Sequence, residues 1–300
     1  MSRWEAKTIR AATWIAGAVF AAALILLVMH LSANNLEFSR YNTGWNGTSS
    51  FFSDLDRHRT LDSSDPGSLA GHPPNSTLLI IAPDQHPAAA QLAAYGAFLR
   101  EGNTIFLADD FGTGNEILTG IGSRITILPG NLSSLDRHYD DPYLITVYRT
   151  AAESPFPLPE DFVLNRPAPL DGGSPLMLTS VMSWTDANGD HRLNTKEDMG
   201  TFPVMVTESV GPGTVIVLSD PSIFINSMYN QPENSNNRDF IKKIITPEGM
   251  VLIDQMNSRT RDASGFSEIL HVIRNTVYIE IFIIGLIMLG TAVAWKKKIM

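Results

Sequence analysis

The sequence predicts an α/β domain with a mostly parallel sheet and helices on both faces, flanked by two transmembrane helices. Two apolar runs, Thr77–Pro83 and Thr104–Ala108, have the uninterrupted hydrophobicity of strands that are buried on both faces. Between them, residues 87–100 place Ala, Leu and aromatic residues at helical spacing, which completes the βαβ order of a parallel sheet. Two long apolar segments near the ends of the chain have the length that crosses a bilayer, roughly 20 residues.

The terminal segments predict a two-pass protein of the cell membrane with both termini in the cytoplasm. The uncharged stretch Ala11–Met29 follows three basic residues, and the second apolar stretch runs into Lys296, Lys297 and Lys298. By the positive-inside rule the intervening chain faces outward. A cleaved signal peptide is the alternative for the first span, but its apolar core is longer than the roughly 7–15 residues typical of such peptides.

The expected organisation follows from these spans. It comprises a cytoplasmic tail at 1–8, a transmembrane helix at 9–31, a stalk at 32–50, an extracytoplasmic α/β domain at 51–257 with an insertion at about 121–200, a linker at 258–274, a transmembrane helix at 275–295 and a cytoplasmic tail at 296–300.

Composition narrows the classes of function. The 300 residues contain no cysteine, which removes disulfides, thiolate nucleophiles and cysteine zinc sites. The net charge is −9, and the central region has no Lys/Arg cluster that would suit nucleic acid. Sequons at Asn46, Asn75 and Asn131 predict a glycoprotein if that region is exposed outside the cell.

The second half of the chain is predicted in less detail. Residues 202–207 and 214–220 are expected to form a hairpin around Gly211-Pro-Gly213. Helices are expected at 239–245 and at 247–257.

Carboxylates stand directly after three of the predicted strands. Asp84, the pair Asp109 and Asp110, and Asp220 each follow a buried apolar run. If those strands are parallel neighbours, the four side chains share the carboxyl edge of the sheet, where α/β folds bind ligands. The bland alternative is that Asp is simply a good turn former and helix cap. The complete expected ligand or partner edge is Asp84, Asp109, Asp110, Gly112, Thr113, Gly114, Asn115, Asp220 and Asn226.

A second motif resembles a twelve-residue calcium loop. Its oxygen ligands would be Asp186, Asn188, Asp190, the carbonyl of Arg192, Asn194 and Glu197. This spacing offers the hard oxygen ligands that Ca²⁺ prefers, and predicts a structural calcium ion. His191 stands at the sixth position, where such loops carry Gly, so an unliganded turn rich in Asp and Asn is the alternative.

The sequence lacks the common motifs for nucleotide binding and for a catalytic serine. A dinucleotide fingerprint starting at Gly112 would need Gly at position 117, which is Ile117. The chain has neither a P-loop nor a Gly-x-Ser-x-Gly elbow.

Several separated segments resemble the archaeal and bacterial family DUF4350. They are residues 78–83, 104–115, 183–186 and 217–226. The resemblance covers roughly residues 38–255 and implies a fold similar to class I glutamine amidotransferases and GldG-like domains. Because such catalysis needs a cysteine at a strand-to-helix elbow, the resemblance implies a non-catalytic relative. It also implies an assembly partner of the MoxR and DUF58 type.

The leading expectation is therefore a membrane-anchored, outward-facing binding or scaffolding domain with a flavodoxin-like sheet. It would serve as an accessory subunit of a membrane or cell-envelope assembly, with the lipid bilayer and a protein as partners and no nucleic acid. The alternative is a metal-assisted hydrolase in which Asp109, Asp110 and Asp220 hold a divalent ion that activates water.

Overall fold

The computed structural model describes residues 36–55, 59–136, 141–190, 192–195, 197, 199–230, 235–245 and 249–261, together with Gly17, Ala21 and Leu24. The chain divides into two compact units, one of residues 35–261 and one of residues 1–34 with 262–300. The first of these units carries all the helices and strands described below.

The predicted two-pass membrane topology is not supported. Among the residues that the structure describes, no helix is long and apolar enough to cross a membrane. The expected spans at 9–31 and 275–295 lie outside those residues, apart from Gly17, Ala21 and Leu24.

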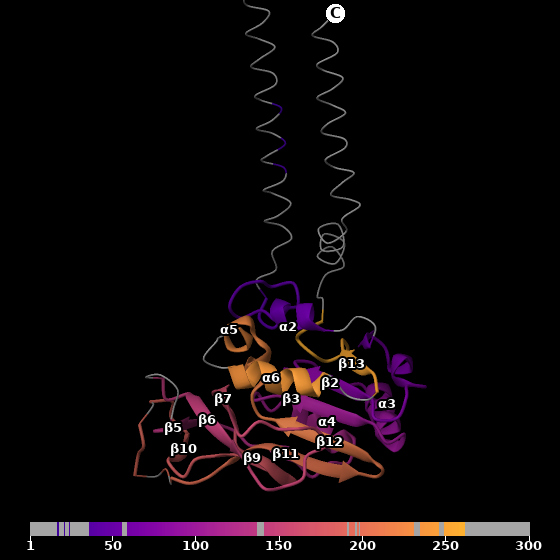
Figure 1. Ribbon diagram of the computed structural model, residues 1–300. Coiled ribbons are helices and arrows are strands. Elements are labelled where there is room, and N and C mark those ends of the chain that lie inside the picture. Colours follow the sequence, from indigo (N-terminus) through magenta and orange to yellow (C-terminus); the bar gives the residue numbers. More distant parts are fainter. Residues whose placement is uncertain are drawn as a thin grey trace, which may run out of the picture. The chain divides into compact units, whose positions relative to one another are not determined.

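A nine-stranded sheet forms the centre of the 35–261 unit (Figure 1), in the order β1-β13-β2-β3-β12-β11-β9-β6-β7. Its strands are β1 (Thr60–Ser63), β2 (Thr77–Ile81), β3 (Thr104–Ala108), β6 (Leu144–Arg149), β7 (Asp161–Asn165), β9 (Ser174–Thr179), β11 (Pro203–Val210), β12 (Gly213–Leu218) and β13 (Val251–Asp254).

The sheet is mixed, which corrects the prediction of a mostly parallel flavodoxin-like or amidotransferase-like sheet. The pairs from β1 to β12 run parallel, whereas β12-β11, β11-β9, β9-β6 and β6-β7 are antiparallel. The physical reason is connectivity. The tight β11–β12 hairpin reverses the chain, and three strands from the expected insertion at 121–200 extend the same sheet.

Each parallel strand buries alternate residues on opposite faces of the sheet. Leu79, Phe106 and Ile216 contribute to one hydrophobic core, while their neighbours Leu78 and Ile105 contribute to the other. All five are fully buried. This is why the strands read as continuous apolar runs in the sequence.

Short helices cover both cores. The described helices are α2 (Ser49–Asp54), α3 (Ala89–Arg100), α4 (Gly114–Gly120), α5 (Asn226–Tyr229) and α6 (Ser235–Ile244), with 3₁₀ turns η1 (Pro66–Leu69) and η2 (Pro221–Phe224). Figure 1 shows α2, α5 and α6 together over one part of the sheet, and these three share a core through Phe51, Tyr229 and Phe240. Helices α3 and α4 belong to the other core.

Helix α3 shows how the sequence specifies the helices that pack on the sheet. Tyr95, Phe98 and Leu99 lie three and four residues apart, so they share one face, and all three are buried. The helix ends at Arg100 and is followed by Gly102, whose φ of 81° favours glycine and whose N–H donates to the carbonyl of Leu99.

Two small antiparallel sheets complete the unit. One pairs β4 (Thr126–Ile127) with β8 (Leu170–Asp171), and the other pairs β5 (Asn131–Ser134) with β10 (Ser183–Asp186).

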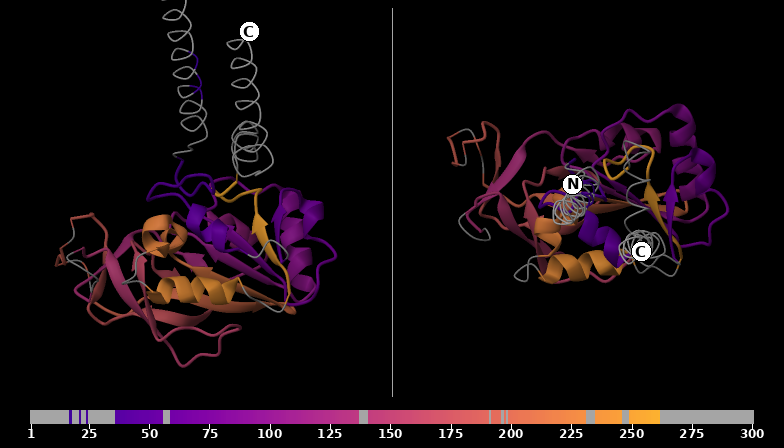
Figure 2. Two further views of the ribbon diagram at one scale, coloured as in Figure 1. Left: turned by 45° about the horizontal axis from the view of Figure 1, so that its top comes forward. Right: turned by 90° about the horizontal axis from the view of Figure 1, so that it is seen from above.

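The prediction of a helix at 247–257 is wrong. Val251–Asp254 form β13, which lies between β1 and β2 and is fully buried along its length (Figure 2). A short apolar run fits a buried strand as well as a helix, and here the place between two parallel strands decides the outcome.

Candidate functional site at the carboxyl edge

The three strands that precede the predicted acids are parallel neighbours. Strand β3 lies between β2 and β12, and Ala108 pairs with both Ile81 and Leu218 at the ends of the ladders. The segments that follow these strands therefore leave the sheet at one edge, which we call the carboxyl edge.

Asp109 organises the turn into α4. Its Oδ1 accepts the N–H of Phe111 at 2.9 Å, and its Oδ2 accepts the N–H of Gly114 at 2.7 Å. Burial raises the pKa of this fully buried carboxyl above its usual range, although the backbone donors oppose the shift. Both carboxyl oxygens are thus engaged in holding the turn.

Asp110 is different, because one of its two carboxyl oxygens lacks such a donor. Within the described part of the chain, its Oδ1 is buried and has no hydrogen-bond partner. Burial, and then the negative charges of Asp220 and Asp109, raise the pKa of Asp110 to about 8. This carboxyl therefore carries its proton near neutral pH and can donate a hydrogen bond.

Asp220 caps the 3₁₀ turn η2. Its Oδ1 accepts the N–H of Ser222 at 2.7 Å and its Oδ2 accepts the N–H of Asn165 at 2.5 Å. Burial raises the pKa of Asp220 to about 7, against the opposing effect of these donors. The negative charge of Asp220 in turn contributes to the raised pKa of Asp110.

Two arginines from the segment after β13 complete the edge, and sequence reasoning missed both. Arg261 forms an ion pair with Asp84 at 2.5 Å. The guanidinium of Arg259 lies 4.4 Å from the ring centroid of Phe111, whose side chain is 53% exposed, and pairs with Glu37 at 3.3 Å. Arg259 also lowers the pKa values of Asp109 and Asp110, though less than burial raises them.

The other predicted edge residues hold the fold. Gly112 supplies a φ of 81° in the turn, and Thr113 precedes α4 without a side-chain cap bond. Asn115 pairs with the backbone of Ile127. Asn226 instead ties η2 and α5 to the segment 42–50, through the carbonyl of Gly44 and the N–H of Ser50 among other groups.

Backbone strain lies beside this edge. Ala82 has a φ of 48°, a left-handed conformation that is uncommon for a residue with a Cβ. It is fully buried, its N–H donates to Ala108, and its carbonyl accepts from the N–H of Arg259. Strain of this kind persists only where the surrounding contacts impose it.

A buried polar network at the end of β13 was also missed. Tyr95 donates its hydroxyl proton to Asp254 at 2.7 Å and accepts from the side-chain amide of Asn257 at 2.7 Å. The other oxygen of Asp254 accepts from the N–H groups of Asn257 and Ser258. The sequence signal was present, since Val251-Leu-Ile-Asp254 is a fourth apolar run that ends in a carboxylate.

The predicted calcium loop is not supported. No group of three or more acidic, His or Cys side chains that could hold a metal ion occurs among the described residues, which do not include His191. Asp186 accepts the N–H of Gly189, Asp190 accepts the N–H of Arg192, and Glu197 accepts the N–H of Ala187. Asn188 and Asn194 join the same bonds, so the oxygens close the loop on itself in Asx turns.

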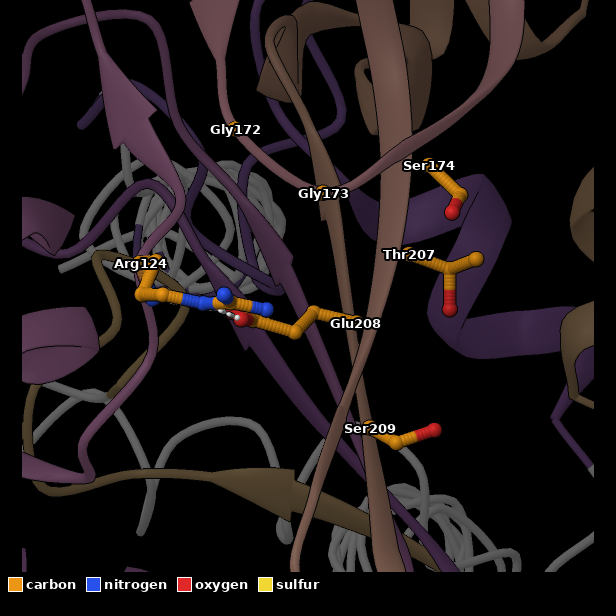
Figure 3. Close-up of a pocket in the computed structure, with 7 residues that line it drawn as sticks. All are labelled: Arg124, Gly172, Gly173, Ser174, Thr207, Glu208 and Ser209. Atoms are coloured by element: carbon orange, nitrogen blue, oxygen red, sulfur yellow. Dashed lines mark hydrogen bonds and ion pairs between the residues drawn. The ribbon is translucent and has the colours of Figure 1, made fainter.

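A pocket that includes none of the predicted acids was not anticipated either. It has a volume of about 570 Å³ and is lined by Arg124, Gly172, Gly173, Ser174, Thr207, Glu208 and Ser209 (Figure 3). Ladder β11–β12 pairs Glu208 with Val215, near the start of β12, so the pocket lies toward the opposite end of the strands from the carboxyl edge. Its two charged residues are 84 positions apart, and no local pattern connects them.

Comparisons with known proteins identify a family without an assigned activity. Residues 40–241 match the family described as a domain of unknown function (DUF4350). No curated protein matches the chain.

Solved structures give only weak likenesses. The mmIFT52 N-terminal domain is 16% identical, with a TM-score of 0.40, over 56% of this chain and 76% of that one. A β-galactosidase from the Antarctic haloarchaeon Halorubrum lacusprofundi is 16% identical, with a TM-score of 0.31, over 56% of this chain and 22% of that one. An α-L-fucosidase from Paenibacillus thiaminolyticus is 15% identical, with a TM-score of 0.30, over 56% and 24%.

Proposed function

The chain belongs to the DUF4350 family, and we propose that it is a non-catalytic binding domain that holds a protein partner at its carboxyl edge. The observation that carries this proposal is the contact between the exposed Phe111 and the half-buried Arg259. Phe111 is 53% exposed, and the guanidinium of Arg259 lies 4.4 Å from the centroid of its ring. Aromatic residues and arginine are enriched at the energetic centres of protein interfaces.

The surroundings of this pair support a specific contact. Arg259 is held in place by Glu37, and its backbone is fixed to the strained end of β2. A preorganised side chain loses less entropy on binding than a free one. Asp110 stands next to Phe111 and carries a proton near pH 7, so it adds a hydrogen-bond donor for a partner.

Catalysis has less support from the same geometry. In the metal-assisted hydrolase alternative, Asp109, Asp110 and Asp220 would share an ion. However, both oxygens of Asp109 and both oxygens of Asp220 already accept backbone N–H groups, which leaves Asp110 as the one carboxyl of the three with an unused oxygen. The chain also contains no cysteine that could act as a thiolate nucleophile.

Site-specific photo-crosslinking tests the proposal. A benzophenone amino acid replaces Phe111 in the full chain, produced in its native host, and adducts are separated by size and identified by mass spectrometry. The control is the same replacement at Leu135, which is 56% exposed and therefore matched in accessibility.

We expect one discrete protein adduct from position 111 and none from position 135. A second substitution, Arg259→Ala, should reduce the adduct from position 111 by at least about tenfold, since interface arginines often contribute 2 kcal/mol or more. No adduct at position 111, or the same adducts at both positions, would contradict the proposed binding surface.

A further inference from the structure

We propose that the pocket between β11 and the β8–β9 turn binds an oxyanion, a carboxylate or phosphate group, through the guanidinium of Arg124. This site is separate from the carboxyl edge and does not depend on the function proposed for that edge. Figure 3 shows Arg124 reaching across the pocket to Glu208, below Gly172 and Gly173.

Glu208 fixes the direction of the guanidinium. Its Oε1 accepts Nε of Arg124 at 2.7 Å, while its Oε2 accepts the backbone N–H of Arg124 at 2.8 Å and the hydroxyl of Ser123 at 2.7 Å. The Glu208 side chain is 7% exposed, whereas that of Arg124 is 86% exposed. A buried carboxylate thus orients a solvent-facing cation.

The binding end of Arg124 is unoccupied. Within the part of the chain that the structure describes, the bonds of its guanidinium all go through Nε, and Nη1 and Nη2 have no partner. These two nitrogens offer parallel donors that match the spacing of two oxygens on a carboxylate or phosphate.

Two consecutive glycines form the turn that lies against Arg124 and β11. Gly172 and Gly173 have φ values of 84° and 68°, which disfavour any residue with a Cβ. A Cβ at Gly172 would lie 2.6 Å from the carbonyl oxygen of Arg124, and one at Gly173 would lie 3.0 Å from that of Thr207. The turn can therefore approach Arg124 and β11 closely only because both residues lack side chains.

One side of the pocket lies where the pairing between β11 and β9 ends. The β11–β9 ladder stops at the pair Thr207 and Ser174, while the β11–β12 ladder continues to Val210. Beyond Thr207, β11 therefore runs past the end of β9 on that side, where Glu208 and Ser209 line the pocket.

The charge of the pair persists at neutral pH. Burial raises the pKa of Glu208, but the hydrogen bonds from Arg124 and Ser123 outweigh it, so the net effect lowers the pKa. Glu208 stays ionised and keeps its hold on Arg124, while its own oxygens are occupied.

Calorimetric titration of the purified full chain with inorganic phosphate, and separately with succinate, at constant ionic strength tests this site. Arg124→Gln should weaken binding of the anion at least about tenfold, the loss of about 1.4 kcal/mol from a charge-assisted bidentate contact. Arg124→Lys should recover only part of the affinity, because an ammonium lacks the planar fork.

A matched control makes the result specific. Arg100→Gln removes an exposed arginine from α3, outside the pocket, and should leave the affinity unchanged.

Binding of phosphate alone, succinate alone or both, with loss in Arg124→Gln, supports the site and defines the anion it prefers. Two results would overturn it. One is heats equal to dilution for both anions in the wild type, and the other is equal affinity in Arg124→Gln and wild type with an unchanged melting temperature.

Discussion

At the scale of single residues, Asp110 makes stability depend on pH. Its pKa is about 8 in the folded chain, against an ordinary value of 3.8. Between these values the folded state keeps a proton that the unfolded state releases, so stability falls as pH rises through this window. Asp110→Asn stays neutral at every pH, and we expect it to lose less stability than the wild type between pH 4 and pH 8.

Urea unfolding at pH 4.5 and pH 8.5 measures this difference. The advantage of Asp110→Asn should be small at pH 4.5 and reach several kcal/mol at pH 8.5, because each unit of difference between the folded and unfolded pKa corresponds to about 1.4 kcal/mol. Asp171→Asn, which changes an exposed carboxyl in β8, is the control. If the stability of Asp110→Asn and of the wild type depended on pH in the same way, the pKa of Asp110 would not be raised in the folded chain.

Gly114 tests how closely the turn packs. A Cβ there would lie 2.8 Å from Cδ2 of Leu107 and 3.0 Å from Oδ2 of Asp109, which accepts the N–H of Gly114. Gly114→Ala should therefore destabilise the fold by about 1–3 kcal/mol through overpacking. Gly200→Ala, where a Cβ would meet nothing within 4 Å, should change stability by less than about 0.5 kcal/mol in the same urea measurement. Comparable losses in both variants would argue against the close contact.

At the scale of elements, Tyr95 joins α3 to β13. Tyr95→Phe would leave Asp254 without its hydroxyl donor and the amide of Asn257 without its acceptor, both in the interior. We expect a loss of about 1–3 kcal/mol in the free energy of unfolding at pH 7. The matched change Tyr148→Phe removes an exposed hydrogen bond to Asp136 and should cost less than about 0.5 kcal/mol. If both tyrosines respond alike, burial of the Asp254 network is not what stabilises this junction.

The parallel strands were predictable because burial on both faces requires an uninterrupted run of apolar residues. Runs such as Leu78–Ile81 and Ile105–Ala108 are apolar without interruption, and they end in the acids that meet at the carboxyl edge. The apolar run of β13 has only three residues, which is too short to distinguish a strand from a helix. The antiparallel β11–β12 hairpin was predicted, but the pairing of β6, β7 and β9 was missed because these strands come from a proline-rich region and pair with distant partners.

The acidic residues of the candidate site were predicted from the sequence, whereas its arginines were missed. Asp109 and Asp220 follow strands, so their location comes from local pattern. Arg259 and Arg261 reach the edge only because β13 inserts beside β2, which no local pattern indicates. The same applies to Arg124 and Glu208, which lie on elements brought together by the sheet.

At the scale of the whole 35–261 unit, one sheet is shared by two cores. Strands β2, β3 and β12 contribute to both, so each is held by side chains on two faces and by hydrogen bonds on two edges. The small sheets β4–β8 and β5–β10 have only two strands each. Two-stranded ladders are marginal on their own, and their stability depends on packing against the larger body.

This difference predicts a gradient of amide protection across the unit. Hydrogen exchange followed by mass spectrometry should show β2, β3 and β12 exchanging only on global unfolding, because opening them exposes both cores. Peptides covering β4, β8, β5 and β10 should exchange at least about a hundredfold faster, which corresponds to opening that costs about 3 kcal/mol less. Protection of β5 and β10 equal to that of β3 would show instead that the small sheets unfold together with the central one. The small sheets and the nine-stranded sheet would then form a single cooperative unit.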